Sequence, residues 1–200
     1  MAVQSVAVKL LRPTQIAVGK RLVKMKRRGL CERERRPQEL VDFILANPIR
    51  VVIGPKERAY IIDHHHLGHA LLDERFKTAP VEVEADLSKL ALSEFWKEME
   101  KRLWVHPFDG RGRSRAISEI PSSLAKMEDD PYRSLAGFVR LVGGFNKTMT
   151  PYMEFQWADY FRPLIKPKSL QVNFEKSVAK AKVLAHGPEA GHLPGYIAKT

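Results

Sequence analysis

Apolar and polar positions in the first half of the chain follow two periods, one typical of strands and one typical of helices. Short runs of β-branched and other apolar residues predict strands at residues 3–11, 49–53, 59–62 and 80–85. Apolar residues three and four positions apart predict helices at residues 37–46 and 65–76. Residues 18–25 are compatible with a short helix or an extended piece. Charged residues dominate the segment 20–36, for which we expect a mobile basic loop, with an ordinary solvated face as the alternative. The first half is therefore predicted to mix strands and helices.

The second half of the chain shows mainly helical spacing. Helices are predicted at residues 94–103, 130–141, 150–161 and 172–185. Residues suited to helix starts support three of them, namely Ser93, Asp130-Pro131 and Thr150-Pro151. Residues 104–114 show no period and are expected to be irregular. The pattern therefore predicts a mostly helical second half.

The composition adds a strong positive charge to this picture. The 200 residues are 44% hydrophobic, which is enough for a sizeable core, and they carry a net charge of +11. Residues 1–60 hold 14 Lys or Arg against 5 Asp or Glu, so the excess lies mainly there. This bias favours nucleic acid, a nucleotide or an acidic membrane surface as partner, although an ordinary solvated surface can have the same composition. The candidate nucleic-acid-binding residues are Lys24, Lys26, Arg27 and Arg28.

The single cysteine and the lack of long apolar runs argue against a disulfide-bonded protein and against a membrane-spanning protein. Cys31 alone cannot form an internal disulfide, which fits a reducing compartment, and no apolar run approaches the length of a membrane span. We therefore expect a cytoplasmic protein without a membrane partner, and its oligomeric state stays open. The sequence also lacks a G-x-S-x-G elbow, a P-loop and a dinucleotide-binding fingerprint.

A cluster of histidines follows the predicted strand 59–62. The strand leads into Asp63 and three consecutive histidines, after which helical spacing begins. Such a junction is a common phosphate site, because the first N–H groups of a helix are unpaired and the helix dipole favours anions. We expect catalysis from Asp63, His65 and His66, with Asp63 taking a proton, orienting a hydroxyl or holding Mg²⁺. Further candidates for phosphate or nucleotide binding are His64, Gly68 and His69.

Two other interpretations of these histidines stay open. His65 and His69 are four residues apart and share a helix face, so they could ligate a metal ion. However, no familiar zinc pattern is complete and Cys31 is remote, so neither zinc nor another resident metal is expected. Alternatively, some of the four histidines are simply packed or exposed.

The segment 109–115, Asp-Gly-Arg-Gly-Arg-Ser-Arg, is a second candidate for anion binding. Its glycines permit close approach of the backbone to a ligand. The guanidinium groups of Arg111 and Arg113 can fork onto phosphate or carboxylate. Loops of arginine and glycine are also common on protein surfaces, so the segment alone is a weak indication.

Eight short sequence motifs, spread over nearly the whole chain, carry a resemblance to a known family. They are residues 11–15, 51–55, 60–67, 85–88, 104–109, 129–137, 154–161 and 193–196. In content and order these stretches resemble the ParB-like nuclease family.

This resemblance implies a ParB/sulfiredoxin-type fold of the α+β class, with a small mixed sheet flanked by helices. Residues 1–88 would form the ParB-like domain, and residues 89–200 would form a mostly helical, family-specific extension packed on it. The resemblance also implies a nucleotide-phosphate site after the strand that ends at Asp63. ATP or another nucleotide with Mg²⁺ would then be the cofactor. Relatives include CTP-binding partition proteins, ATP-using sulfiredoxin and free-serine kinases.

The chain departs from the Asp-Gly-His-His-Arg stretch of the free-serine kinases at two positions. Asp63, His65 and His66 match it, whereas His64 stands in place of the glycine and Leu67 in place of the arginine. Gln15 also stands where the kinases would carry a catalytic glutamate, and glutamine cannot act as a base. The expected function is phosphodiester hydrolysis or nucleotide-dependent phosphotransfer. The alternatives are a free-serine kinase and a non-catalytic module that binds nucleic acid or a nucleotide.

Overall fold

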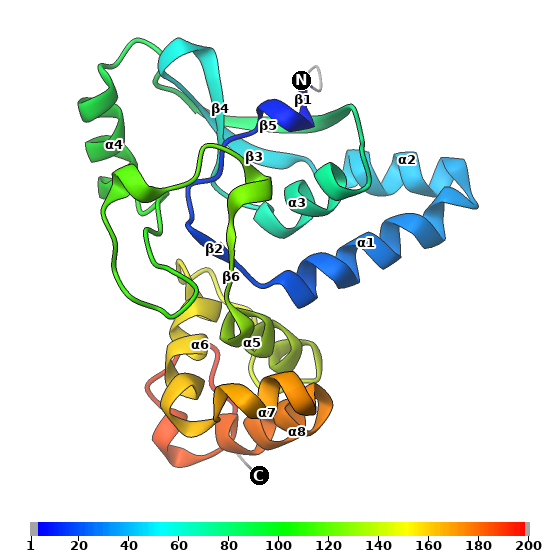
Figure 1. The fold of residues 1–200 in the computed structure, drawn as a ribbon, viewed down its shortest axis with the longest axis vertical. Coiled ribbons are helices and arrows are strands. Elements are labelled where there is room, and N and C mark those ends of the chain that lie inside the picture. The colour runs from blue at the N-terminus through cyan, green and yellow to red at the C-terminus, as the bar shows by residue number, and fades with distance from the viewer. Residues whose placement is uncertain (1–3, 199–200) are drawn as a thin grey trace. The chain divides into compact units, whose positions relative to one another are not determined.

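The computed structural model describes residues 4–198, which form two compact units (Figure 1). The first unit comprises the described residues up to Val18 together with Val23–Glu128. The second comprises Gly19–Leu22 together with the described residues from Asp129 onward. The segment 89–128, which the sequence led us to expect in a helical extension, therefore lies in the first unit.

A four-stranded mixed sheet forms the centre of the first unit, in the order β1-β5-β3-β4. Its strands are β1 Gln4–Ala7, β3 Ile49–Gly54, β4 Arg58–Ile61 and β5 Thr78–Asp86. The pair β3 and β5 is parallel and the other two pairs are antiparallel. The α+β class and the hairpin of β3 and β4 are thus confirmed. The expected first strand is shorter, because its chain turns into a 3₁₀ helix at Val8, and residue 3 lies outside the described residues.

Both faces of this sheet are covered. On one face, α3 (His65–Asp73) packs over Ile49, Val51 and Ile61. On the other face, α4 (Leu92–Lys101) packs Phe95 and Met99 against Val52 and Tyr60. This double burial explains the consecutive apolar residues 51–53 of β3, because Val51 and Val52 point to opposite faces and both are fully buried. It also explains why the segment containing α4 belongs to the first unit.

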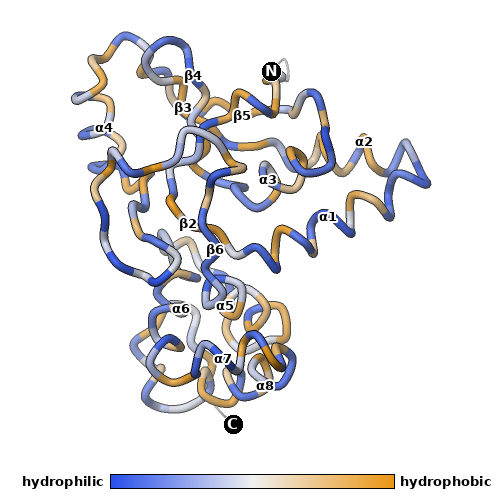
Figure 2. The backbone as a smooth tube through the Cα atoms, viewed as in Figure 1, coloured by the Kyte–Doolittle hydropathy of each residue, from blue (hydrophilic) through white to orange (hydrophobic). Residues whose placement is uncertain are grey.

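The basic segment is a helix, so the expectation of a mobile loop at residues 20–36 was wrong. Helix α1 spans Lys20–Glu34, and α2 follows at Pro37–Ala46, as predicted. Val23 and Leu30 of α1 are buried in the core beside α3, while the charged side chains between them are mostly exposed or half-buried. Val23 and Leu30, together with the buried Leu22, therefore give this highly charged helix its apolar side. Figure 2 shows the hydrophilic turn that joins α1 to α2.

The second unit is helical. Its elements are α5 Pro131–Leu141, α6 Met153–Leu164, α7 Pro167–Val172 and α8 Phe174–Ala185. Trp157 and Phe161 of α6 are fully buried in its core. Asp130 caps α5 by accepting the N–H groups of Tyr132 and Arg133, which is why the helix begins there. The last helix expected at 172–185 is α8, which begins at Phe174 because the side chain of Asn173 caps its start; the short helix α7 before it was not predicted.

The segment Gly19–Leu22 is part of the second unit although it lies far earlier in the sequence. The N–H of Arg21 donates to Ser134 Oγ at 3.2 Å, and its guanidinium donates to the carbonyl of Leu170 at 3.1 Å. Leu22 lies so close to Gly137 that a Cβ added there would be 2.5 Å from a Leu22 methyl carbon. This short segment therefore fits tightly against α5.

The remaining elements are short. They are β2 Ala17–Val18, which pairs with β6 Glu128–Asp129, and the 3₁₀ helices η1 Val8–Leu10, η2 Pro55–Glu57, η3 Ile117–Glu119, η4 Leu124–Lys126 and η5 Pro188–Ala190. Among residues 4–198, no helix combines the length and the apolar character that crossing a membrane requires.

Candidate functional site

The predicted catalytic residues lie together where β4 ends and α3 begins. Asp63 is exposed, and its Oδ1 accepts the N–H of His64 at 2.7 Å. His65 and His66 form the first turn of α3; His65 is 3% exposed and His66 is half-buried. The junction therefore places a water-facing carboxylate directly before the N-terminus of a helix, where anions are favoured.

The junction contains a backbone conformation that is unusual for its residue type. His64 has φ 69° and ψ 26°, which is left-handed, and its Nδ1 is buried without a hydrogen-bond partner in the described chain. A non-glycine residue held in this region costs about 1–2 kcal/mol. This is the position at which the resembling kinase motif has glycine. A glycine would adopt this conformation without strain.

His65 is held in place by a residue 51 positions earlier. Its Nε2 accepts the N–H of Thr14 at 3.2 Å, and Thr14 Oγ1 donates to the carbonyl of Ile61 at 2.7 Å. The Thr14 hydroxyl is also 3.3 Å from the same ring nitrogen. Because Nε2 accepts a hydrogen bond, it carries no proton in this arrangement. His65 thus fixes the end of β4 to the segment that contains Thr14.

Three distant segments of the first unit meet at this point. The N–H of Arg12 donates to the Ala59 carbonyl, and the N–H of Ile61 donates to the Arg12 carbonyl, so residues 11–15 run parallel to β4. One step further, the N–H of His106 donates to the Thr14 carbonyl at 2.9 Å. Thr14 and His106 were not predicted as site residues, because nothing in their local sequence reveals contacts across 51 and 92 positions.

Two of the predicted phosphate ligands lie inside α3 rather than at its start. The N–H of Gly68 donates to the carbonyl of His64, and a Cβ added at Gly68 would lie 3.1 Å from Ile61 and 3.4 Å from Leu124. His69 is buried, with Nδ1 3.4 Å from a carboxylate oxygen of Asp73. The structure therefore shows Gly68 in a close helix-to-sheet contact and His69 beside an acid one turn later.

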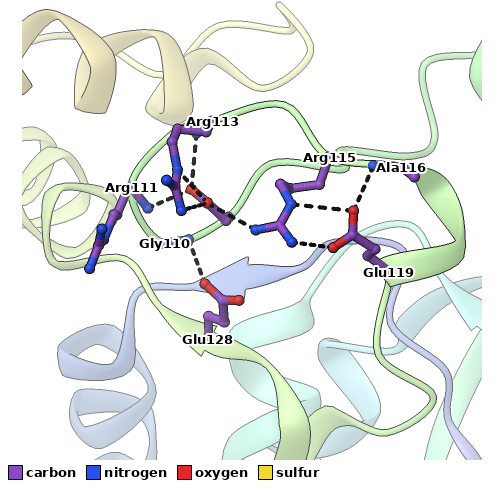
Figure 3. Close-up of polar contacts among 8 residues, drawn as sticks. Gly110, Arg111, Arg113, Arg115, Ala116, Glu119 and Glu128 are labelled. Atoms are coloured by element: carbon purple, nitrogen blue, oxygen red, sulfur yellow. Dashed lines mark hydrogen bonds and ion pairs between the residues drawn. The ribbon is translucent and has the colours of Figure 1, made fainter.

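The predicted arginine loop is built around the carboxylate of Asp109, which is only 3% exposed (Figure 3). One of its oxygens accepts the N–H groups of Arg111 and Arg113 at 2.9 and 3.0 Å. The other accepts the side chain of Arg113 at 2.8 Å and lies 3.4 Å from that of Arg115. Arg115 also pairs with Glu119, and the N–H of Gly110 donates to Glu128.

These contacts set the ionisation of Asp109 and separate the two predicted arginines. Burial alone would raise the pKa of Asp109, but the hydrogen bonds from Arg113 and Arg111 outweigh it and hold the pKa well below its usual value. The guanidinium of Arg113 is engaged in this network. In contrast, the side chain of Arg111 is exposed, and it extends away from the side chains of Arg113 and Arg115 in Figure 3.

Comparison with known proteins gives the family. Residues 4–163 match the family described as "Putative ParB-like nuclease". The chain belongs to this family. It is also similar over its full length to a solved structure, the crystal structure of protein Atu1540 from Agrobacterium tumefaciens. The two sequences are 40% identical, the match covers 100% of both chains, and the TM-score is 0.89. No curated protein matches the chain.

In this ParB-like nuclease family member, the four predicted nucleic-acid-binding residues lie on α1 but differ in their surroundings. Lys24 and Arg28 are exposed, and Lys26 is half-buried. Arg27 forms ion pairs with Asp73 and Glu74 at the end of α3. Arg27 therefore ties α1 to α3, whereas Lys24 and Arg28 face solvent.

The Asp63–His66 junction carries the exposed carboxylate of Asp63 and three imidazoles. No three or more His, Cys, Asp or Glu side chains between residues 4 and 198 are arranged to hold a metal ion. Mg²⁺ commonly binds through one or two carboxylates together with substrate phosphates. Asp63 is suited to that kind of shared binding, in which the substrate supplies the remaining oxygen ligands.

Proposed function

We propose that this protein carries out phosphate chemistry at the Asp63–His66 junction, either by hydrolysing a phosphodiester bond or by breaking a phosphoanhydride bond of a nucleotide and transferring its phosphoryl group to an acceptor. The observation that carries the proposal is the exposed carboxylate of Asp63, which stands directly before the N-terminus of α3. The family description supports phosphodiester hydrolysis, since it names a nuclease.

The junction offers a distinct role to each residue. The N-terminus of α3 attracts a phosphate group through its dipole. Asp63 takes the proton of the attacking water or hydroxyl, or shares Mg²⁺ with the phosphate oxygens. His66 adds a hydrogen-bond donor from the first turn of the helix. His65 acts as a positioning residue, because its contact with Thr14 fixes the turn in which Asp63 stands.

The amino-acid kinase alternative receives less support from the site. Gln15 is buried, lies next to Thr14 and pairs through its backbone with His106, so it is close to the junction. Its neutral amide cannot accept a proton from a serine hydroxyl. The proton of the serine hydroxyl would then have to go to Asp63.

A second candidate function is non-catalytic binding of nucleic acid, and the exposed face of α1 favours it. Lys24 and Arg28 are one helical turn apart and face solvent. Phosphate binding through such cations weakens steeply with salt, because counterions are released on binding. Replacing both residues with glutamate should therefore reduce DNA affinity at low salt. A DNA affinity that does not change with salt concentration would contradict this candidate function.

The decisive experiment for the first proposal is an activity comparison of Asp63→Asn with wild type. ATP, CTP, plasmid DNA and free serine with ATP are each incubated with and without Mg²⁺, and hydrolysis, nicking and phosphoserine are measured. Asp63→Asn should lower the rate at least about 100-fold, the usual scale for losing a general base. It should fold normally, because asparagine can still accept the N–H of His64.

Asp42→Asn is the matched control, since Asp42 is an exposed aspartate on α2 outside the junction. Its activity should equal that of wild type. Full activity in Asp63→Asn, or an equal loss in both variants, would contradict the role of Asp63. DNA binding without any turnover would favour the binding module instead.

A further inference from the structure

Helices α7 and α8, which lie side by side in the second unit, carry a concentration of lysines together with the turn before α7 (Figure 1). Residues 164–185 contain five lysines and a single acid, Glu175, so their net charge is +4. Lys182 is half-buried, and the exposed lysines are Lys166, Lys168, Lys176 and Lys180. The stretch is therefore a strongly basic part of the second unit.

The outward face of α7 combines a lysine with an exposed apolar side chain. Leu170 is 1% exposed and packs into the core of the second unit. With about 3.6 residues per turn, Lys168 and Val172 lie one turn apart on the side of the helix opposite Leu170. Lys168 is exposed, and Val172 is 75% exposed.

The outward face of α8 repeats this combination. The buried residues of the helix are Ser177, Val178, Ala181 and Ala185. Its opposite side carries Lys176, Lys180 and Val183, and Val183 is 72% exposed. Lys180 also donates to the carbonyl of Leu164 at 3.4 Å, which places α8 beside the turn that leads into α7. The two helices therefore form one surface, the α7–α8 lysine surface, made of Lys166, Lys168, Val172, Lys176, Lys180 and Val183.

The lysines of this surface have no acidic partner. In the second unit, Arg133, Arg140 and Arg162 all pair with acids. Within residues 4–198, no lysine of the α7–α8 lysine surface forms an ion pair. Glu175 precedes Lys176 but is turned about 100° away from it around the helix. Because like charges on one face repel each other, an anionic partner would be attracted to this surface.

Two kinds of polyanion could meet a lysine surface, and the exposed valines decide between them. Nucleic acid is bound through cations and hydrogen-bond donors on its phosphates, and through stacking on aromatic rings. The α7–α8 lysine surface has no aromatic residue, and its valines would have no counterpart on a phosphate backbone. An anionic bilayer uses both kinds of side chain, because its headgroups attract lysines and its acyl boundary accepts apolar groups.

We propose that the α7–α8 lysine surface binds the surface of a membrane that contains anionic phospholipids. The lysines lie at the level of the headgroups, and Val172 and Val183 enter the outer part of the acyl region. This departs from the expectation of no membrane partner, which rested on the lack of membrane-spanning runs and did not concern surface binding. The inference goes beyond the proposed function and does not depend on the Asp63–His66 junction.

Co-sedimentation of the full chain with vesicles tests the proposal, using phosphatidylcholine with and without phosphatidylserine. Wild type should bind the anionic vesicles at least about tenfold more tightly than the neutral ones, and salt should release it. A glutamine variant replaces the four exposed lysines, as Lys166→Gln, Lys168→Gln, Lys176→Gln and Lys180→Gln. Its binding should be at least about 50-fold weaker, since each lysine near an anionic surface contributes about fivefold.

The matched control removes the same charge from exposed lysines of the first unit. Its changes are Lys9→Gln, Lys56→Gln, Lys89→Gln and Lys97→Gln. Because distant charges are screened by salt, this control should lose less than about threefold in affinity for anionic vesicles. Both glutamine variants should melt like wild type, because every replaced side chain is exposed.

A serine variant, Val172→Ser with Val183→Ser, tests the apolar part and keeps every charge. It should bind anionic vesicles about tenfold more weakly than wild type, because two partly inserted side chains lose their apolar character. Its affinity for duplex DNA should not change. An unchanged affinity of the serine variant for the vesicles would contradict insertion of the valines and with it the choice of a membrane.

Three further results would overturn the proposal. They are a wild type that does not bind anionic vesicles, an equal loss in the glutamine variant and its control, and a glutamine variant that binds like wild type. Duplex DNA binding that only the glutamine variant loses, without vesicle binding, would assign the surface to nucleic acid instead. None of these results bears on Asp63, whose role is tested by turnover.

Discussion

Two aspartates of the first unit each open a turn, and they differ in what surrounds them. Asp109 is buried and accepts hydrogen bonds from the backbone and side chains of a short arginine loop. Asp63 is exposed and accepts the N–H of His64. A carboxylate whose lone pairs are satisfied by its own loop holds that loop together. A carboxylate that faces water can still take a proton or a cation, so burial separates the structural acid from the one suited to chemistry.

The difference between the two aspartates is tested most directly by replacing each with asparagine. Asp109→Asn should lower the free energy of unfolding by about 2–4 kcal/mol, because an amide cannot satisfy all of the donors and leaves a guanidinium poorly paired. Asp63→Asn should change it by no more than about 0.5 kcal/mol, as for most surface sites. Urea unfolding of both variants measures the difference. Equal losses would show that the two acids are not distinct.

Acid pH offers a second test of the same contrast. The pKa of Asp109 is lower in the folded protein than in the unfolded chain, so the unfolded chain takes up its proton first as the pH falls. The stabilisation is complete above the ordinary aspartate pKa of about 3.9 and is lost progressively below it. Wild type should therefore lose about 2 kcal/mol more than Asp109→Asn between pH 5 and pH 2. Parallel stability curves for the two proteins would contradict this expectation.

A smaller effect is expected at the contact that fixes the Asp63 turn. Thr14→Val keeps the N–H donated to His65 but removes the hydroxyl that donates to Ile61. This change should cost about 1–2 kcal/mol, because the buried carbonyl loses a partner. Thr14→Ser keeps a hydroxyl and should recover most of the loss in thermal unfolding. If serine and valine behave alike, the hydroxyl contributes nothing.

The smallest change should stabilise the protein. His64→Gly removes the strain of a left-handed histidine and its unpaired ring nitrogen, at the cost of greater freedom in the unfolded chain. A net gain of about 0.5 kcal/mol is expected from the difference of these two terms. His66→Gly, within the helix, should instead cost about 1 kcal/mol. Calorimetric melting of the two variants should therefore shift in opposite directions.

Local signals allowed much of the fold to be predicted. Pro37 at a first helical position and Asn47-Pro48 at the end gave the bounds of α2. The apolar runs and the turn at Gly54 gave the hairpin that leads to Asp63. The place of the candidate site, at a strand end and a helix start, followed from the same local pattern.

Other features depend on contacts that no local pattern contains. Helix α1 was missed because its charged residues outnumber Val23 and Leu30, whose burial depends on the distant core. The pairing of Thr14 with His65 is likewise invisible until β4 has brought the two segments together. The Asp109 loop is different, because its donors lie within six residues. An aspartate followed by glycines could have suggested that the acid organises the turn.

The membership of Gly19–Leu22 in the second unit has a consequence for how the protein is made. These four residues leave the ribosome long before α5, yet Leu22 covers Gly137 and Arg21 bonds to Ser134 and Leu170. The core of the second unit can therefore be completed only after α5 has been synthesised, because it includes a segment that lies about 110 residues earlier in the chain. A fragment that begins at Asp129 would expose the bare surface of Gly137. For the same reason, no truncation at a single position yields either unit complete and by itself.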